Sequence, residues 1–426
     1  MTRHIAHITI EANTPLKVGS SASDFLQDSP VQKDWNNLPM MLGTSIAGVL
    51  RKDFDKNLVD DVFGKNDGSK VIFSNALLVD ETGKVSEKLL LKKSKFLQIF
   101  DNLPIREHTA ITDKGAAKEY SKFDEEVVFK GTQFKFSIEV LDDEESFKNL
   151  LELLQSPSFR LGGGTTKGFG KFKVLEILTQ TIDTPEALAT YSSSLNNTDG
   201  GRVDLSTNIQ AKNHTTYTLK IKPDDFFMFG AGFGDSDADQ TPVYENVVDY
   251  KNKKLSNKQI LIPASSIKGA LSHRTAFYYN KAMGATIEST EAKTDENNIA
   301  VKAIFGHKKE MAEDKKTELG QKGKILISDC FKEDKEEAKV FDHVSIDRFT
   351  GGAKDGALFQ EKTIAQRDEW EIEILLEKEI EEPFVNAFEK ALEDVCNGML
   401  ALGGATTKGH GVFSGVLLRD GEVLDV

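Results

Sequence analysis

The sequence predicts an α+β protein made of two tandem ferredoxin-like modules, and three observations support this. The glycine-rich string LGGGTTKGFG at 161–170 returns as LGGATTKGHG at 402–411. Four further matched strings, and the same succession of strand-like and helix-like segments, occur in both halves. A chain of 426 residues is also longer than one hydrophobic core usually organises. We therefore expect a first module over 1–180, a linker over 181–212 and a second module over 213–426.

The matched strings show that the duplication covers both halves and not one loop alone. Their order is the same in both copies, whereas their spacing differs, which indicates insertions in loops. The matches pair LPMMLGTSIAGVLR at 38–51 with LIPASSIKGALSHR at 261–274, VFG at 62–64 with IFG at 304–306, VIFSNA at 71–76 with ILISDC at 325–330, and FDEEVV at 123–128 with FQEKTI at 359–364.

Each half predicts the order strand, helix, strand, strand, helix, strand, which is typical of a ferredoxin-like or RNA-recognition-type sheet with helices on one face. The helix after the first strand begins, in this interpretation, at a capping serine. A stretch rich in Thr, Ser, Asn and Gly favours the linker between the halves. The segments are strands at 4–12, 71–79, 125–141 and 169–178 with helices at 45–54 and 145–156, then strands at 216–223, 324–330, 369–377 and 411–419 with helices at 265–283 and 383–402.

Composition narrows the class of protein. No run of eighteen apolar residues occurs, and the N-terminal residues alternate polar and apolar instead of showing a basic and then an apolar stretch. We therefore expect a cytoplasmic protein without membrane contact. The two cysteines, Cys330 and Cys396, stand alone, so neither a disulfide framework nor a zinc site is indicated.

The net charge of −14 argues only weakly against nucleic acid, because the acidic residues are grouped into short stretches. Basic stretches lie between them, at 88–95, 160–173 and 307–309. A local basic groove on an acidic body is therefore compatible with the sequence, since the clustering of charge matters more than its sum.

The two glycine loops are the strongest chemical signal. Glycines let backbone amides approach a bound group, threonines add hydroxyl donors and one lysine adds positive charge, so each loop suits a phosphate backbone. The order Thr-Lys-Gly excludes a Walker A loop. A tight helix-to-strand connection is the alternative interpretation, but turn geometry alone would keep the glycines and not the whole TTKG string.

Together these strings resemble the RAMP superfamily of CRISPR-associated proteins. The resemblance rests on GGGTTKGFGKF, IPASSIKGALSHR, the IFG string and the strands with SNA or SDC. More specifically, the chain looks like a tandem fusion of two backbone subunits, of the Cas seven type, from a type III effector complex similar to subtype III-D. The resemblance implies RNA-recognition sheets with inserted thumb loops that hold a CRISPR guide RNA in antiviral defence. Complementary target RNA and other effector subunits, both large and small, are the implied partners.

The resemblance also implies which residues bind guide RNA. They belong to the glycine loops, the serine-led helices and two Gly- and Thr-rich segments that match the thumb. The expected RNA-binding residues are Gly162, Gly163, Gly164, Thr165, Thr166, Lys167, Gly403, Gly404, Thr406, Thr407, Lys408, Ser45, Ser265, Ser266, Lys268, Arg106 and Arg348.

In the family, a loop after the first strand carries an aspartate that cuts target RNA. In the first half the string Asp-Ser-Pro-Val makes Asp28 the expected catalytic residue, with Asp24 and Asp34 as nearby substitutes. The second-half loop at 230–243 is one residue out of step, so Asp239 or Asp237 serves there, or that copy is inactive.

RNA supplies its own nucleophile, the 2′-hydroxyl, so a carboxylate that accepts its proton or holds a divalent metal can suffice. We expect Mg²⁺ or Mn²⁺ at Asp28. The plain alternative is that these aspartates are ordinary turn residues.

Three functions follow from these observations. The first is an RNA-guided endoribonuclease, a hydrolase that is active only within the complex. The second is a guide-RNA-binding scaffold without cleavage, and the third is a metabolite-binding enzyme built from duplicated ferredoxin-like domains. Isolated histidines such as His108, His343 and His410 argue against a histidine-driven nuclease.

Overall fold

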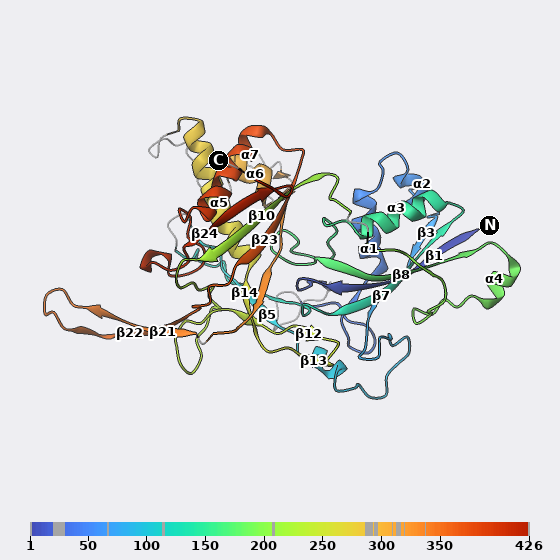
Figure 1. Ribbon diagram of the computed structural model, residues 1–426, viewed down its shortest axis with the longest axis horizontal. Helices are drawn as coiled ribbons and strands as arrows, with labels where there is room; N and C mark the ends of the chain where they lie inside the picture. The colour runs from blue at the N-terminus through green and yellow to red at the C-terminus, as the bar shows by residue number, and fades with distance from the viewer. Residues whose placement is uncertain are drawn as a thin grey trace.

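The computed structural model describes most of the chain. The described residues are 2–19, 30–65, 68–112, 116–206, 209–285, Lys293, 297–308, 310–311, 317–318, 320–336 and 338–424. Two sheets, one in each half of the chain, form the centres of two modules (Figure 1). The first module contains β1 to β9, and the second contains β10 to β25.

The first module is a seven-stranded antiparallel sheet with the order β2-β4-β7-β1-β8-β9, in which β3 also pairs with β7. Strand β1 lies in the centre, and its alternating sequence RHIAHITIEA is buried along almost its whole length. The strands are β1 (Arg3–Ala12), β2 (Met40–Met41), β3 (Val71–Phe73), β4 (Ala76–Leu78), β7 (Gln133–Leu141), β8 (Phe172–Ile182) and β9 (Gly201–Arg202).

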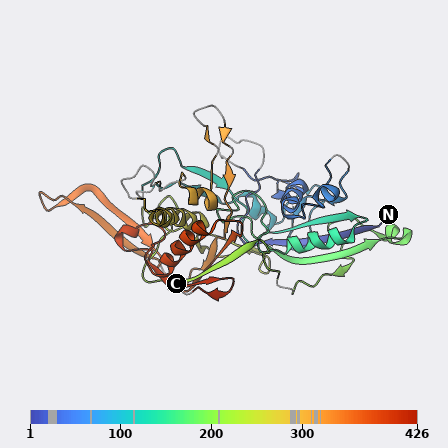
Figure 2. The ribbon, with the colours of Figure 1, turned by 90° about the horizontal axis from the view of Figure 1, so that it is seen from above.

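Helices α1, α2 and α3 of the first module lie on one face of this sheet (Figures 1 and 2). Helix α3 begins where Asp143 accepts a hydrogen bond from the Ser146 amide at 2.9 Å, and Glu144 and Glu145 favour its N-terminus through the helix dipole. The helices are α1 (Gly43–Asp53), α2 (Val59–Phe63), the 3₁₀ turn η1 (Leu97–Asp101), α3 (Glu144–Leu154) and α4 (Pro185–Thr190).

The second module repeats this plan with a five-stranded sheet in the order β19-β23-β10-β24-β25. Its main strands are β10 (His214–Pro223), β19 (Ile325–Ile327), β23 (Trp370–Glu377), β24 (Phe413–Arg419) and β25 (Glu422–Val423). Its helices are α5 (Ala264–Ala282), α6 (Ile299–Phe305), α7 (Glu382–Cys396) and the 3₁₀ turn η2 (Thr406–Lys408).

Both sheets place the first strand between the third and the fourth, with the second beside the third. This is the strand order of the ferredoxin-like fold, so the predicted fold class is confirmed. Each module has its own hydrophobic core, from Ala6 to Ile177 together with Val248 in one and from Tyr217 to Leu417 in the other.

A hairpin inserted before the third strand distinguishes both modules from a bare ferredoxin-like sheet. In the first module it is short, β5 (Ile105–His108) with β6 (Phe123–Glu126). In the second it is β21 (Lys339–Ile346) with β22 (Ala353–Thr363), which extends far from the sheet (Figure 1).

Small antiparallel ladders complete the second half. Strand β14 lies between β11 and β20, and three further pairs stand alone. The strands are β11 (Tyr244–Glu245), β14 (Gln259–Ile262), β20 (Cys330–Glu333), β12 (Val248–Asp249), β13 (Lys254–Leu255), β15 (Gly306–His307), β18 (Gln321–Lys322), β16 (Glu310–Met311) and β17 (Thr317–Glu318).

The predicted serine caps of α1 and α5 are wrong. Helix α1 begins at Gly43 and α5 at Ala264, so Ser45 and Ser266 lie within the first helical turn. The first amides are satisfied by side chains from the short connections between β3 and β4 and between β19 and β20: Asn75 Oδ1 accepts from the Gly43 amide at 2.9 Å and Asp329 Oδ1 accepts from the Ala264 amide at 2.8 Å. A partner so far along the chain replaces the local cap.

The stretch predicted as the linker also contains regular structure. It includes the end of β8, all of α4 and β9, and the buried side chain of Leu195. Within the described residues, no helix is both long and apolar enough to span a membrane.

Candidate functional site

The glycine loops pack against the chain that follows each module's first strand. The Gly163 amide donates to the Lys17 carbonyl at 2.7 Å, and the Gly404 amide donates to the Met228 carbonyl at 2.7 Å. A side chain on the preceding glycine would lie 2.3 Å from the same carbonyl in both modules, where φ is positive. Backbone geometry therefore explains this glycine in each loop, while the threonines and the lysine need another reason.

Lysines from both modules meet beside the first glycine loop. Lys268, on α5, donates from Nζ to Thr166 Oγ1 at 3.2 Å. Burial and the neighbouring charge of Lys167 lower the pKa of Lys268 to about 8. Burial lowers the pKa of Lys167 as well, and although Glu125 opposes this, the charges of Lys17 and Lys308 add to it.

We call Lys167, Lys268 and Lys308 the boundary lysines. Within the described residues, neither Lys167 nor Lys268 forms an ion pair with a carboxylate. Positive charge is thus concentrated between the modules of an acidic protein, which is an arrangement suited to an anion.

A cavity of about 280 Å³ adjoins the first glycine loop. Ser45, Ile46 and Val49 of α1 line one side, and Gly162 and Gly163 line the other. The fold therefore brings Ser45 beside the glycine loop.

In the second module the loop lysine is already paired. Lys408 Nζ lies 2.6 Å from Glu361 Oε2, and the Glu361 side chain is fully buried. His343 and His410 also face this carboxylate, with Nε2 at 3.4 and 3.1 Å from Oε1. Burial alone would raise the pKa of Glu361, but Lys408 and the two histidines outweigh it and the pKa is lowered.

The first module has the same buried glutamate with a different lysine. Glu125 pairs with Lys17, and His108 Nε2 lies 3.4 Å from its Oε2. Burial would raise the pKa of Glu125, but His108, Lys17 and the charge of Lys167 lower it to about 2. Met228 stands at the position of Lys17 in the second module, so Lys408 pairs with the glutamate there.

The acidic loop of the second module is held against β22. Lys362 Nζ lies 2.6 Å from Asp235 and 3.1 Å from Asp237, so both carboxylates share one cation, and Lys362 lowers the pKa of Asp235. Asp239 is exposed, and its Oδ2 accepts a hydrogen bond from the backbone amide of Gln360 at 2.8 Å. Asp239 is therefore the fixed aspartate of this loop that has no cation on it among the described residues.

Asp28 and Asp24 lie outside the described residues. The chain on both sides is nevertheless in register with the second module, because the bridge Gly19–Val31 corresponds to Gly230–Pro242. The stretches between the bridged residues, 20–30 and 231–241, have the same length, so Asp28 and Asp239 occupy corresponding positions in sequence. The one-residue mismatch expected from the two prolines therefore disappears.

Asp34, a nearby substitute in the sequence analysis, is a turn residue. Its Oδ1 accepts hydrogen bonds from the amides of Asn36 and Leu38 at 2.8 and 2.9 Å. This local role is the one expected of an aspartate in a tight turn.

A resident metal ion does not fit the described part of the acidic loops. No group of three or more His, Cys, Asp or Glu side chains there is placed to hold one. Asp235 and Asp237 are occupied by Lys362, which leaves Asp239 as a single ligand. The metal predicted at Asp28 lies outside the described residues.

The two arginines expected in matched segments have different surroundings. Arg106 is buried between the modules, where Nε contacts Glu245 and one terminal nitrogen lies 2.5 Å from Asp329. Burial disfavours its charge, but the two carboxylates outweigh this and raise its pKa. Arg348 is exposed in the turn between β21 and β22. The counterpart of Arg106 is Phe341, because these residues pair with Glu125 and Glu361 in their hairpins.

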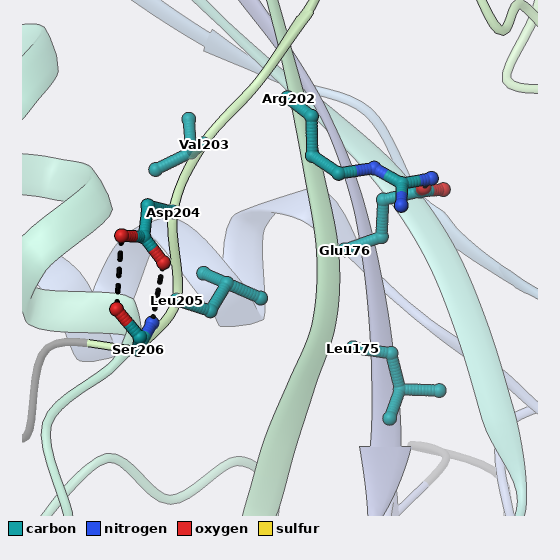
Figure 3. A pocket seen from close by; sticks show the side chains of 7 residues that line it. All are labelled: Leu175, Glu176, Arg202, Val203, Asp204, Leu205 and Ser206. Carbon is teal, nitrogen blue, oxygen red and sulfur yellow. Dashed lines mark hydrogen bonds and ion pairs between the residues drawn. The ribbon is translucent and has the colours of Figure 1, made fainter.

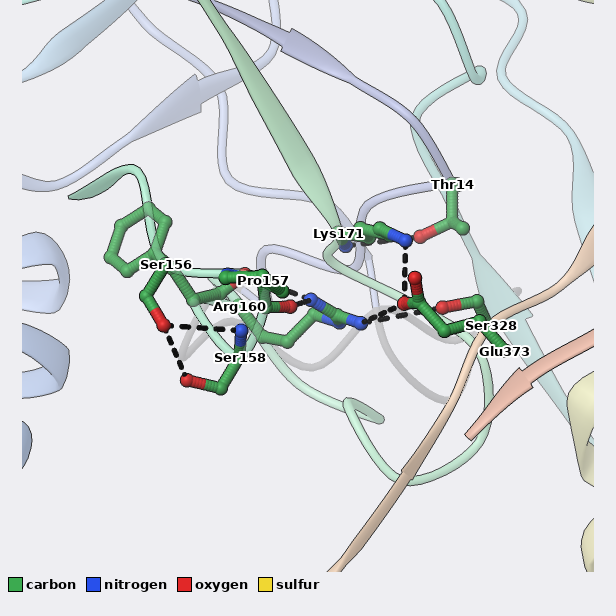
Figure 4. A network of polar contacts seen from close by, with 9 residues as sticks. Thr14, Ser156, Pro157, Ser158, Arg160, Lys171, Ser328 and Glu373 are labelled. Atoms are coloured by element: carbon green, nitrogen blue, oxygen red, sulfur yellow. Dashed lines mark hydrogen bonds and ion pairs between the residues drawn. The ribbon is translucent and has the colours of Figure 1, made fainter. Parts of the chain in front are cut away.

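A second set of polar contacts joins the modules, and sequence reasoning missed it (Figure 4). Lys171 Nζ lies 2.6 Å from Glu373, and Arg160 donates to Ser328 Oγ at 3.3 Å while also facing Glu373 at 3.8 Å. Arg160 and Lys171 flank the first glycine loop, whose basic stretch was the available signal. Their carboxylate partner is remote in the chain, and no local pattern indicates it.

Another cavity, of about 410 Å³, lies over β8 (Figure 3). Leu175 and Glu176 and the stretch 202–206 line it, with an ion pair between Arg202 and Glu176. None of the predicted site residues lines this cavity.

Comparison with known proteins gives one family. The model of the RAMP superfamily matches residues 9–173 and 245–414, one region in each module. A solved structure, "Cryo-EM structure of the Type III-B Cmr-beta bound to cognate target RNA", is 18% identical with a TM-score of 0.32. The match covers 43% of this chain and 61% of that one, and a similarity this low carries no argument. No curated protein matches the sequence significantly.

Proposed function

The chain belongs to the RAMP superfamily, and from this we propose that it is a guide-RNA-binding backbone subunit of a type III CRISPR effector complex. We further propose that the complex cleaves complementary target RNA at the two acidic loops. The partners in this proposal are the guide, the target and the other effector subunits, in the cytoplasm.

The boundary lysines are the observation that supports RNA binding most directly. Lys268 contacts Thr166 beside Lys167, and neither lysine forms an ion pair with a carboxylate among the described residues, on a chain with a net charge of −14. An RNA phosphate beside Lys268 and Lys167 would offset their mutual repulsion. Phosphate contacts of this kind provide most of the affinity for nucleic acid without reading its sequence.

Binding of a labelled guide RNA to the purified chain at several salt concentrations tests this part. The double variant Lys167→Ala/Lys268→Ala should bind more weakly and reduce the slope of log affinity against log salt by about 1.4, or about 0.7 for each phosphate contact on a single strand. Lys148→Ala is the matched control, because Lys148 lies on the exposed face of α3 in an ion pair with Glu144. An unchanged slope in the double variant would remove the lysines from the RNA site.

Cleavage at Asp239 requires only a carboxylate of fixed position. In this proposal the Asp239 carboxylate, held by the Gln360 amide, accepts the proton of an RNA 2′-hydroxyl. The 2′-oxygen attacks the adjacent phosphorus and a 2′,3′-cyclic phosphate forms. The bond to the 5′-oxygen breaks and that oxygen takes a proton from water. The proton held by Asp239 then passes to the hydroxide left behind, which restores the carboxylate. Asp28 serves the same role in the first module by its corresponding position.

The assembled complex with complementary RNA tests the cleavage part. Wild type should cut the target at two positions of fixed separation, Asp28→Asn should lose one cut and Asp239→Asn the other. Asp237→Asn is the control and should keep both, because Asp237 is already engaged in an ion pair with Lys362. An intact target with wild type would leave a guide-binding scaffold. Purification without bound RNA, and no affinity for added guide, would instead favour a duplicated metabolite-binding enzyme.

A further inference from the structure

The contact between the modules, here called the joint, has a one-way charge pattern. In each ion pair named above that crosses the joint, the cation comes from the first module and the carboxylate from the second. Arg106 contacts Glu245 and Asp329, while Arg160 and Lys171 face Glu373. Arg106 and Arg160 are buried there, so their charges depend on these partners.

The same cations have uncharged counterparts in the second module. Arg106 corresponds to Phe341 through the hairpin pairing described above. The residues that flank the glycine loops correspond as well, because the same backbone hydrogen bond closes both loops. The Leu161 amide donates to the Gly170 carbonyl at 3.0 Å, and the Leu402 amide donates to the Gly411 carbonyl at 2.8 Å. Arg160 and Lys171 thus correspond to Ala401 and Val412.

The carboxylates are also largely absent from the first module. Asp329 corresponds to Asn75, since both accept from the first amide of a helix. Glu373 corresponds to Ser137, because their carbonyls accept from the amides of Ser328 and Ser74.

Glu245 corresponds to Asp34, because the Tyr244–Ile260 pair of the second module matches the Lys33–Pro39 bridge of the first. The Asp34 carboxylate already accepts from two amides of its own turn. At the three corresponding positions of the first module, Asn75 and Ser137 are uncharged and Asp34 is already hydrogen-bonded within its own turn. None of them therefore offers a carboxylate to an arginine from another module.

Glycines mark the same difference. A Cβ on Gly168 would lie 2.1 Å from Asp329 Oδ1, so the first glycine loop touches the second module closely. The corresponding Gly409 has nothing within 4 Å of its Cβ position among the described residues. At this point the surface of the first module is covered by the second module, whereas the corresponding surface of the second module, at Gly409, is not covered by any described residue.

We propose that Arg106, Arg160, Lys171, Glu245, Asp329 and Glu373 form a pairing key for RAMP modules. The key joins the cationic face of the first module to the acidic face of the second. It also keeps that cationic face off the uncharged Asn75 and Ser137 face of another copy. A crossed contact would bury Arg106 without a carboxylate, and the reverse contact would bury Asp329 against Phe341, so each wrong pair has an uncompensated charge.

A transplanted key tests this inference without RNA. One full-length variant, Phe341→Arg/Val412→Lys, carries the cations on its open face, and a second, Asn75→Asp/Ser137→Glu, carries the acids. The mixture should form a 1:1 complex in analytical ultracentrifugation, at least tenfold tighter than wild-type chains associate with one another, and added salt should weaken it. The control Leu188→Arg/Thr190→Lys adds the same charge on α4, far from the joint (Figure 1), and should not bind the acidic variant.

Two results would overturn the proposal. One is a mixture of folded variants, with wild-type melting temperatures, that associates no more tightly than wild type. If a transplanted variant does not fold, Asp329→Asn/Glu373→Ser in the native chain replaces it. This variant should accelerate hydrogen exchange in β5 and β14 but not in α3, and unchanged exchange in β5 and β14 would count equally against the key.

Discussion

Replacing Arg106 by methionine should loosen the joint and destabilise the whole chain. The substitution leaves Glu245 and Asp329 buried, at 7% exposure each, without their cation. Removing one partner of a buried charge pair costs about 3–5 kcal/mol. The guanidinium also lies 4.9 Å from the centre of the Phe169 ring, and losing this cation–π contact adds about 1 kcal/mol. We expect a loss of about 4–6 kcal/mol, a large part of ordinary stability.

Urea unfolding followed by circular dichroism measures this loss. The two modules have separate cores. The variant should therefore unfold in two transitions, whereas wild type should unfold in one. The matched control Arg51→Met removes an exposed pair with Asp60 and should cost less than about 1 kcal/mol. An Arg106→Met variant within about 1 kcal/mol of wild type would refute the reasoning.

A triple variant separates lost charge balance from lost packing. Arg106→Met/Glu245→Gln/Asp329→Asn removes all three charges, and replacing a buried ionic group by neutral residues is often nearly neutral. Asparagine at 329 should still accept from the Ala264 amide, as Asn75 does from Gly43. The triple variant should therefore recover most of the stability. If it remains as unstable as Arg106→Met, packing and not charge holds the joint.

Three further predictions concern the glycine loops and the boundary lysines. Gly168→Ala should cost about 1–3 kcal/mol more than Gly409→Ala in urea unfolding, because both have positive φ but only the first meets the other module, and equal costs would contradict this. Lys167→Ala should reduce the slope of log RNA affinity against log salt at least twice as much as Lys408→Ala, because Lys408 is already paired with Glu361. A larger effect of Lys408→Ala would show that this ion pair does not keep Lys408 from RNA. Because the pKa of Lys268 is lowered to about 8, its charge is lost as the pH rises through that value. RNA affinity should fall there in wild type but not in Lys268→Arg, and parallel pH profiles would be evidence against it.

The duplication and the ferredoxin-like order of both halves could be predicted because they depend on local patterns. Alternating strands such as β7 and amphipathic helices such as α3 and α7 show their buried faces directly in the sequence. The glycine loops could be predicted as close backbone contacts, because a run of residues without a Cβ lets another backbone segment approach closely. The family assignment followed from these strings and is confirmed by the match to both modules.

The first residues of helices α1 and α5 could not be predicted from the sequence around them. Ser45 and Ser266 stand where a capping serine is expected, yet Asn75 and Asp329 satisfy the first amides from connections between strands that follow in sequence. A cap of this kind depends on where the next strand lies, so no pattern near the serine indicates it.

The sequence by itself determined the two modules, the paired loops and the candidate aspartates, because repeats and periodicity are local properties of the chain. Only the tertiary structure decided which charges meet. Arg106, expected at an RNA surface, is instead buried against two carboxylates from the other module, and Lys167 is unpaired where Lys408 is paired. The physical reason is that ion pairs form between residues distant in sequence, and their energy depends on burial and distance.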